Sequence, residues 1–259
     1  MIKVNDRIVK PEELFHKIDK SAQRIIIKQM AGYNEIYPYG TIHQLKFELL
    51  FRTNTLKAAT DLNKSGAKFT TYQYAFCNPK YWYRLSNGGF LLKNNVKPSV
   101  AILDILKKGP LYAFECSTAI AIVLYISTLY SIGSSLFDAY FKGLYLMDWQ
   151  FDDDLPVYQK NSDDFISGDV LHFKNPDFDP KQPHWRAENV IYFGDDRYYG
   201  HGVGIRSAST IIKFLNSKRK PNPTESAFLM RLISRPSISI TILINSSRIN
   251  LKFGSRKSG

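Results

Sequence analysis

The chain has 259 residues, 44 % hydrophobic and 14 % aromatic, and this composition excludes a disordered protein. A formal net charge of +12 favours acidic macromolecular partners, although an ordinary basic surface explains it equally well. Only two cysteines are present, Cys77 and Cys116, which excludes a disulfide framework and indicates a reducing compartment.

The sequence shows no signal for nucleic-acid binding or for a membrane. No nucleic-acid-binding module is recognisable, so we expect no nucleic-acid partner. The longest apolar run, residues 119–126, is shorter than the roughly 20 residues that span a bilayer. Residues 1–6 lack the apolar segment of a signal peptide, and we therefore expect synthesis in the cytoplasm.

The first third of the chain is predicted to be mainly helical. Proline followed by two glutamates favours a helix start at Pro11, and the pattern continues to about residue 30. Thr41 and Gln44 have the spacing of a capping box, and the apolar positions that follow have helical periodicity. Gly66 is a suitable stop for this second helix.

The middle of the chain alternates in character. Residues 67–92 are β-branched and aromatic and are interrupted by turn residues, which predicts short strands. A short helix is expected from Pro98 to about residue 109. Residues 116–125 are apolar almost all round, which predicts a helix buried in the middle of a domain.

Strands dominate the predicted structure after about residue 143. We expect strands at 144–149 and 169–173, a hairpin over 189–201, and a further helix at 207–215. Helices followed by an antiparallel sheet define an α+β fold.

Cys116 is the clearest candidate for chemistry. A helix start supplies unpaired N–H groups and the positive end of a dipole, both of which stabilise a thiolate. These N–H groups also suit the oxyanion of an attacked carbonyl. The alternative is a small buried hydrophobic residue, a common role for free cysteine.

The surrounding pattern resembles the NlpC/P60 branch of papain-like enzymes. In that branch a cysteine opens a helix, a Gly-Asp strand follows, as at Gly168-Asp169, and a base stands at the head of the next strand. Glu188 occupies the position of the histidine base. This difference argues against an ordinary cell-wall peptidase.

A narrower resemblance is to the spore transglutaminases of bacilli, the protein-glutamine γ-glutamyltransferases. The similar blocks are residues 64–69, 109–120, 173–180, 185–191, 200–205 and 215–217. They extend over residues 1–235, which we interpret as one catalytic domain. Residues 236–259 read as a basic C-terminal tail of unknown role.

The resemblance implies a papain-like, NlpC/P60-type core, with the cysteine helix packed on an antiparallel sheet and additional helices at the N-terminus. It implies Cys116 as nucleophile, Glu188 as its partner and Glu115 as a supporting carboxylate. Activity is expected without calcium, metal or cofactor. For Glu115 the alternative is a helix-dipole role, and for Glu188 a surface position on an edge strand.

Four further residues are candidates for substrate binding. Phe69, Trp149 and Trp185 adjoin the similar blocks and are interpreted as walls of a dry approach that favours amines over water. Ordinary core packing explains them equally well. His201 would orient the site or act as an alternative base, and a structural histidine is the competing interpretation.

The predicted reaction joins proteins. Cysteine attacks a glutamine carboxamide, ammonia leaves, and a lysine amine resolves the thioester into an ε-(γ-glutamyl)lysine isopeptide bond. The resemblance implies glutamine- and lysine-bearing spore coat proteins as substrates, a location in the spore coat or at the spore surface, and a monomer. The alternatives are a cysteine hydrolase of the same fold, a peptidase or glutamine deamidase, and an inactive structural coat protein.

Overall fold

The computed structural model describes residues 1–237 apart from 17, 19 and 20. The α-helices are α1 (Pro11–Phe15), α2 (Ser21–Gly32), α3 (Ile42–Lys64), α4 (Pro98–Lys107), α5 (Cys116–Ile132), α6 (Ser134–Tyr140) and α7 (Ala208–Asn216). Short 3-10 helices are η1 (Tyr72–Tyr74), η2 (Gly109–Leu111) and η3 (Pro183–Arg186). The strands are β1 (Ile2–Val4), β2 (Arg7–Val9), β3 (Tyr37–Tyr39), β4 (Lys68–Phe69), β5 (Trp82–Arg84), β6 (Phe90–Leu92), β7 (Ala113–Phe114), β8 (Tyr145–Leu146), β9 (Val157–Asn161), β10 (Val170–Lys174), β11 (Ala187–Gly194), β12 (Arg197–Gly200), β13 (Gly204–Arg206) and β14 (Phe228–Pro236).

The largest sheet has the strand order β13-β12-β11-β10-β14-β9, and every pair in it is antiparallel. The predicted hairpin is confirmed as β11 and β12, which meet at a turn with positive φ at Asp195 and Asp196. In the register of β10 and β11, Phe173 lies opposite Glu188 and His172 opposite Asn189. Helices and antiparallel sheets are thus combined in a mixed α/β architecture.

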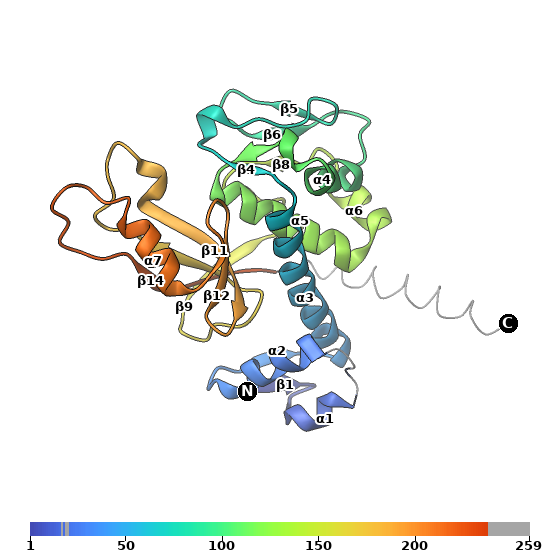
Figure 1. The fold of residues 1–259 in the computed structure, drawn as a ribbon. Helices are drawn as coiled ribbons and strands as arrows, with labels where there is room; N and C mark the ends of the chain where they lie inside the picture. Colours follow the sequence, from blue (N-terminus) through green and yellow to red (C-terminus); the bar gives the residue numbers. More distant parts are fainter. Residues whose placement is uncertain (17, 19–20, 238–259) are drawn as a thin grey trace.

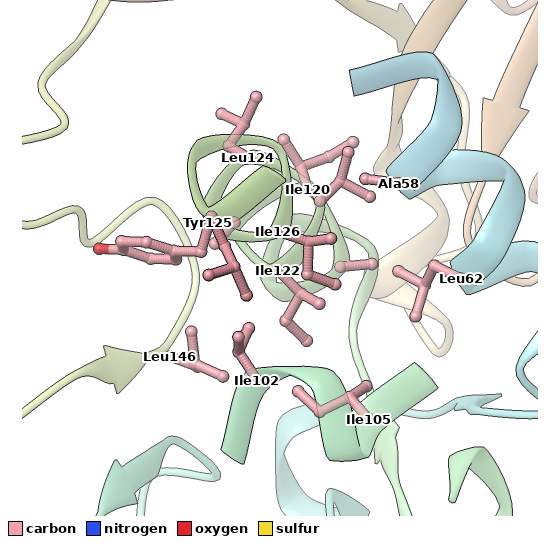
Figure 2. Close-up of a cluster of buried hydrophobic side chains, with 14 of the residues drawn as sticks. Ala58, Leu62, Ile102, Ile105, Ile120, Ile122, Leu124, Tyr125, Ile126 and Leu146 are labelled. Atoms are coloured by element: carbon pink, nitrogen blue, oxygen red, sulfur yellow. The ribbon is translucent and has the colours of Figure 1, made fainter. Parts of the chain in front are cut away.

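Helix α5 forms the centre of the fold. It begins at Cys116, as predicted, and its apolar residues are buried nearly all round. Ile102 and Ile105 of α4 approach one side, and Ala58 and Leu62 of α3 approach another (Figure 2). A fully buried isoleucine or leucine contributes roughly 1.5–3 kcal/mol relative to an exposed one, so this cluster fixes the helix whose first turn carries Cys116.

Helix α3 runs through the molecule beside α5 (Figure 1). The predicted capping box is confirmed, since Thr41 Oγ1 accepts from Gln44 N and Gln44 Oε1 accepts from Thr41 N. The stop is also confirmed: the helix ends at Lys64, and Gly66 has φ +84°, a conformation that glycine adopts without strain.

A separate small core lies at the N-terminal end of α3. The three-stranded sheet β2-β1-β3 and helices α1 and α2 surround it, below the rest of the molecule in Figure 1. The strands β1 and β2 were not predicted, although Asn5 and Asp6, both with positive φ, form the turn that such a hairpin requires.

The single helix predicted over residues 11–30 is wrong. Helix α1 ends at Phe15, and α2 begins at Ser21. Arg24 explains why the interruption is tolerated, because its guanidinium donates to the carbonyl oxygens of Ile18 and Phe15 at 3.0 Å each. Backbone acceptors released by the break are thereby satisfied.

Other differences concern the sheets. The strand predicted over residues 144–149 is reduced to β8 and belongs to a small sheet with β5 and β6, not to the large one. The strands β9, β13 and β14 and helix α6 were not predicted. The expected tail, residues 236–259, lies outside the described residues from 238 onward.

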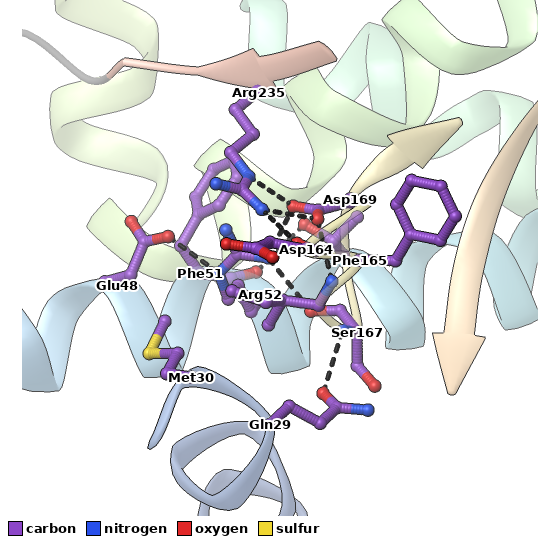
Figure 3. Close-up of polar contacts among 12 residues, drawn as sticks. Gln29, Met30, Glu48, Phe51, Arg52, Asp164, Phe165, Ser167, Asp169 and Arg235 are labelled. Atoms are coloured by element: carbon purple, nitrogen blue, oxygen red, sulfur yellow. Dashed lines mark hydrogen bonds and ion pairs between the residues drawn. The ribbon is translucent and has the colours of Figure 1, made fainter. Parts of the chain in front are cut away.

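A buried ionic network ties α3 to the large sheet (Figure 3). Asp169 accepts from Arg52 Nη1 at 2.8 Å and from Arg235 Nε and Nη2 at 2.7 Å each. Glu48 contacts Arg52 Nε at 2.7 Å, so that the network pairs two guanidinium groups with two carboxylates. Although burial alone raises it, the two guanidinium groups hold the pKa of Asp169 below its usual value. The network thus fixes Asp169, the residue directly before β10, against α3.

No helix in the described part of the chain is both long enough and apolar enough to cross a bilayer.

Candidate active site

The first turn of α5 holds the sulfur of Cys116 beside a carboxylate. Glu115 is the N-cap residue, and its Oε2 accepts from the backbone N–H and the hydroxyl of Ser117 at 2.8 Å each. Its other oxygen, Oε1, lies 3.3 Å from Cys116 Sγ. One carboxyl group therefore caps the helix with one oxygen and faces the thiol with the other.

Burial determines the resting state of the thiol. It raises the pKa of Cys116 well above its usual value, and the neighbouring acidic side chains of Glu188 and Glu115 raise it further. A hydrogen bond from the backbone N–H of Asn189 acts in the opposite direction. We expected the helix terminus to stabilise a thiolate, but burial and two acidic neighbours outweigh it, so the resting sulfur is a thiol.

Glu188 lies on β11 and is completely buried. The alternative of a surface acid on an edge strand is therefore wrong, since β11 has β10 and β12 on its two sides. Within the described part of the chain, neither carboxyl oxygen has a hydrogen-bond partner. Burial and the charge of Glu115 raise the pKa of Glu188 well above its usual value, so the side chain holds a proton at neutral pH.

A cavity of about 460 Å³ opens onto the thiol. Its lining residues are Thr71, Tyr72, Glu115, Cys116, Ser117, Asp148, Trp149, Pro183, His184, Arg186, Ala187 and Asn189. The polar side chains of the cavity include the acidic Asp148, the phenolic Tyr72 and the cationic Arg186. The cavity is thus large enough for an extended side chain and carries polar groups of both signs.

The predicted aromatic residues occupy different places. Trp149 lines the cavity beside Cys116. Phe69 and Trp185 stack on each other with ring centroids 4.7 Å apart, and His184, which does line the cavity, is 5.0 Å from Trp185. Trp149 therefore borders the cavity itself, while Phe69 and Trp185 form a second layer behind His184.

His201 is a buried residue with both ring nitrogens in use. Nδ1 lies 3.2 Å from Tyr199 Oη, and Nε2 lies 3.1 Å from the carbonyl oxygen of Lys68. The ring stacks on Phe114 at 4.6 Å, and burial lowers its pKa to about 4. These contacts favour the structural interpretation of His201 over a role as base.

The sequence analysis missed two residues that contact the reactive groups. Asn189 donates its side-chain amide to Cys116 Sγ at 3.5 Å. The hydroxyl of Tyr72 lies 2.7 Å from Ser117 Oγ and 3.4 Å from Glu115 Oε2. Asn189 directly follows the predicted Glu188, and this adjacency was the available signal, whereas Tyr72 had none beyond its place in an aromatic segment.

A buried cysteine that begins a central helix, faces a cavity and contacts a carboxyl group is the arrangement of a cysteine-dependent acyl-transfer enzyme. Comparison with known proteins gives the particular family. The family model described as protein-glutamine gamma-glutamyltransferase matches residues 1–244. This chain therefore belongs to the protein-glutamine gamma-glutamyltransferase family, the transglutaminases, as the sequence blocks indicated.

Individual relatives agree with this assignment. A protein-glutamine gamma-glutamyltransferase of Bacillus licheniformis is 40 % identical over 242 residues, covering 93 % of this chain and 98 % of the relative. The enzyme of the same name from Bacillus subtilis is 41 % identical over 236 residues, covering 91 % and 96 %. A solved transglutaminase from Geobacillus stearothermophilus, without its C-terminal extension, has a TM-score of 0.75 at 43 % identity, covering 78 % of this chain and 97 % of the other.

Proposed function

We propose that Cys116 is the nucleophile of a two-step γ-glutamyl transfer between proteins. The sulfur attacks the γ-carboxamide of a glutamine, ammonia leaves, and a lysine amine attacks the resulting thioester to form an isopeptide crosslink. The observation that carries this proposal is the position of Sγ: it faces a cavity and lies 3.3 Å from Glu115 Oε1, with the acidic Glu188 nearby.

The two carboxyl groups divide the proton transfers. The S–H proton passes to Glu115 Oε1, the carboxylate oxygen in contact with the thiol. Glu188, which holds a proton at rest, protonates the departing nitrogen and becomes a carboxylate. When the lysine amine attacks, Glu188 takes a proton from it, and the sulfur recovers its proton from Glu115. Protons balance over the cycle, and ammonia is the other product.

The architecture of this site supports a papain-like, NlpC/P60-type core. The features in favour are a cysteine at the first position of a buried helix and a glutamate on a central strand of an antiparallel sheet. We further propose that residues 1–235 form one catalytic domain and that the chain acts as a monomer. The family model, which matches residues 1–244, supports one unit of about this extent.

We propose spore coat proteins that carry glutamine and lysine as the substrates, and the coat or spore surface as the site of action. The family resemblance supports this setting, and the net charge of +12 supports attraction to acidic coat components. Such attraction weakens as salt shortens the range of electrostatic forces. We also propose that activity needs no calcium, since the sequence lacks an acidic loop with EF-hand spacing.

The deciding experiment measures incorporation of a labelled primary amine into a glutamine-bearing protein, without calcium and with a chelator present. The wild type is expected to incorporate the amine and to release an equal amount of ammonia. Cys116→Ala is expected to abolish both, whereas Cys77→Ala, the matched control at the other thiol, keeps them. Residual crosslinking by Cys116→Ala rejects Cys116 as nucleophile, and ammonia release without amine incorporation identifies a hydrolase.

A further inference from the structure

A line of hydrogen bonds leads from the edge strand β9 of the large sheet to the sulfur of Cys116. Gln159 Nε2 lies 3.2 Å from Ser234 Oγ, which lies 2.9 Å from His172 Nε2. His172 Nδ1 lies 2.7 Å from Asn189 Oδ1, and Asn189 Nδ2 lies 3.5 Å from Cys116 Sγ. The line crosses four neighbouring strands, β9, β14, β10 and β11, and ends at α5.

The chemistry of the groups fixes the direction of this line. An amide oxygen only accepts, so His172 Nδ1 must carry the proton that is shared with Asn189 Oδ1. Burial lowers the pKa of His172, which keeps the ring neutral and leaves Nε2 as an acceptor for the Ser234 hydroxyl. Ser234 Oγ accepts in turn from Gln159. Every donor therefore points towards Cys116, and each bond polarises the next.

We propose that His172 is a positioning residue for the γ-glutamyl transfer: through Asn189 it aims an amide N–H at Cys116 Sγ and stabilises the sulfur whenever it is negative. That happens twice, when the thiol loses its proton to attack glutamine and when the thiolate leaves on attack by the amine. The inference rests on Cys116 being the reacting thiol. It assigns a role to a buried histidine that the proton transfers above do not use.

Few titratable groups act on this line in the described part of the chain. Those that affect the pKa of the sulfur are Glu115 on its own helix and Glu188 on β11: the Glu115 carboxylate opposes a thiolate, and Glu188 does so once it has given up its proton. Around His172, the neighbours are Asn189, Ser234 and the ring of Trp149, whose centroid is 5.5 Å away. The backbone and side-chain donors of Asn189 therefore favour a negative sulfur, against the two acidic side chains.

The test follows the rate of alkylation of Cys116 by iodoacetamide from pH 7 to pH 10, below the thiol pKa, where the rate is proportional to the thiolate fraction; the rate is quantified on the peptide by mass spectrometry. His172→Phe is expected to shift this rate profile upward by about one pH unit, which is a tenfold slower rate at a given pH. His172→Asn, which restores a donor near the place of Nδ1, is expected to recover most of this shift. Cys77, whose pKa burial raises to about 11, is the internal control and keeps its own profile.

A double-variant comparison separates this role from loss of fold. Asn189→Ala shifts the profile upward, and adding His172→Phe to it produces no further shift, because both act through one path. If His172→Phe unfolds, Ser234→Ala takes its place, with a smaller upward shift that vanishes in the Asn189→Ala background. An unchanged or downward profile, or a shift that adds to that of Asn189→Ala, overturns the inference. Alkylation needs no substrate, so failure of amine incorporation by the wild type is a separate result.

Discussion

Gly200 lies directly against the carboxyl group of Glu188. A Cβ atom at position 200 would stand 2.7 Å from Glu188 Oε1 and 3.2 Å from its Cγ. Gly200 is on β12, opposite Val190 of β11, so the contact is a diagonal one between neighbouring strands. The missing side chain thus provides the space in which the buried carboxyl group lies.

The first prediction is that Gly200→Ala displaces Glu188. We expect amine incorporation to fall at least tenfold, with a loss of about 1–3 kcal/mol in the free energy of unfolding from overpacking. Steady-state kinetics and denaturant unfolding measure the two effects. Gly32→Ala is the matched control, since a Cβ there has nothing within 4 Å. Wild-type kinetics in Gly200→Ala would show that the carboxyl group has room to move without consequence.

The second prediction concerns Glu188→Gln. The variant is expected to lose most of the transfer rate, because the amide can neither protonate the leaving nitrogen nor accept a proton from the amine. The fold is expected to remain, since glutamine has nearly the same shape as the protonated acid. Circular dichroism and amine incorporation check both parts. An active Glu188→Gln enzyme would remove Glu188 from the reaction.

The same variant makes a prediction about pH and stability. The folded-state pKa of Glu188 is raised, so its protonated form stabilises the wild type fully below the unfolded value of about 4.3. This stabilisation is lost as the pH rises towards and through the folded value. Glutamine does not titrate, and the melting temperature of Glu188→Gln is therefore expected to exceed that of the wild type increasingly from pH 5 to pH 9. Parallel curves would mean that Glu188 is not perturbed.

Local signals allowed parts of this fold and site to be predicted from the sequence. Helix α3 has a capping box and a glycine stop, and α5 has a continuous apolar run. The start of α5 then placed Cys116 and Glu115 together. Glu188 was identified only through the family resemblance, and its complete burial was not foreseen because neighbouring strands provide it.

Contacts between distant segments could not be predicted in this way. Strand β9 is polar and at the edge of the sheet, and β14 contains charged residues and ends in proline, so neither has the alternation of a half-buried strand. Both contribute to the line that reaches Cys116. Ser234 is 62 residues from His172 in the chain, and a separation of this kind leaves no periodic signal.

The third prediction is that Asp169→Asn destabilises the fold by about 3–5 kcal/mol, because it leaves the guanidinium groups of Arg52 and Arg235 buried without their shared anion. Asp163→Asn is the control, since Asp163 pairs with Arg231 at an exposed position and such pairs contribute at most about 1 kcal/mol. The lowered pKa of Asp169 gives stability above pH ~4 that is lost as the pH falls through the folded value. Urea unfolding at pH 7 and pH 3 should show the difference between the variants shrinking in acid.

The fourth prediction uses the cavity wall. Trp149 borders the cavity beside Cys116, so Trp149→Ala admits water to the thioester. We expect the ratio of glutamate formed to amine incorporated to rise several-fold, with less total turnover. Trp185→Phe is the matched control: Trp185 packs between Phe69 and Phe214 and does not border the cavity.

For Trp185→Phe we expect lower stability with an unchanged product ratio. Mass spectrometry of the glutamine substrate, with and without the amine, measures the ratio directly. An equal ratio in Trp149→Ala and the wild type would show that the indole does not keep water from the thioester. A rise in Trp185→Phe of the same size would instead assign the exclusion of water to the second aromatic layer, which reaches the cavity through His184.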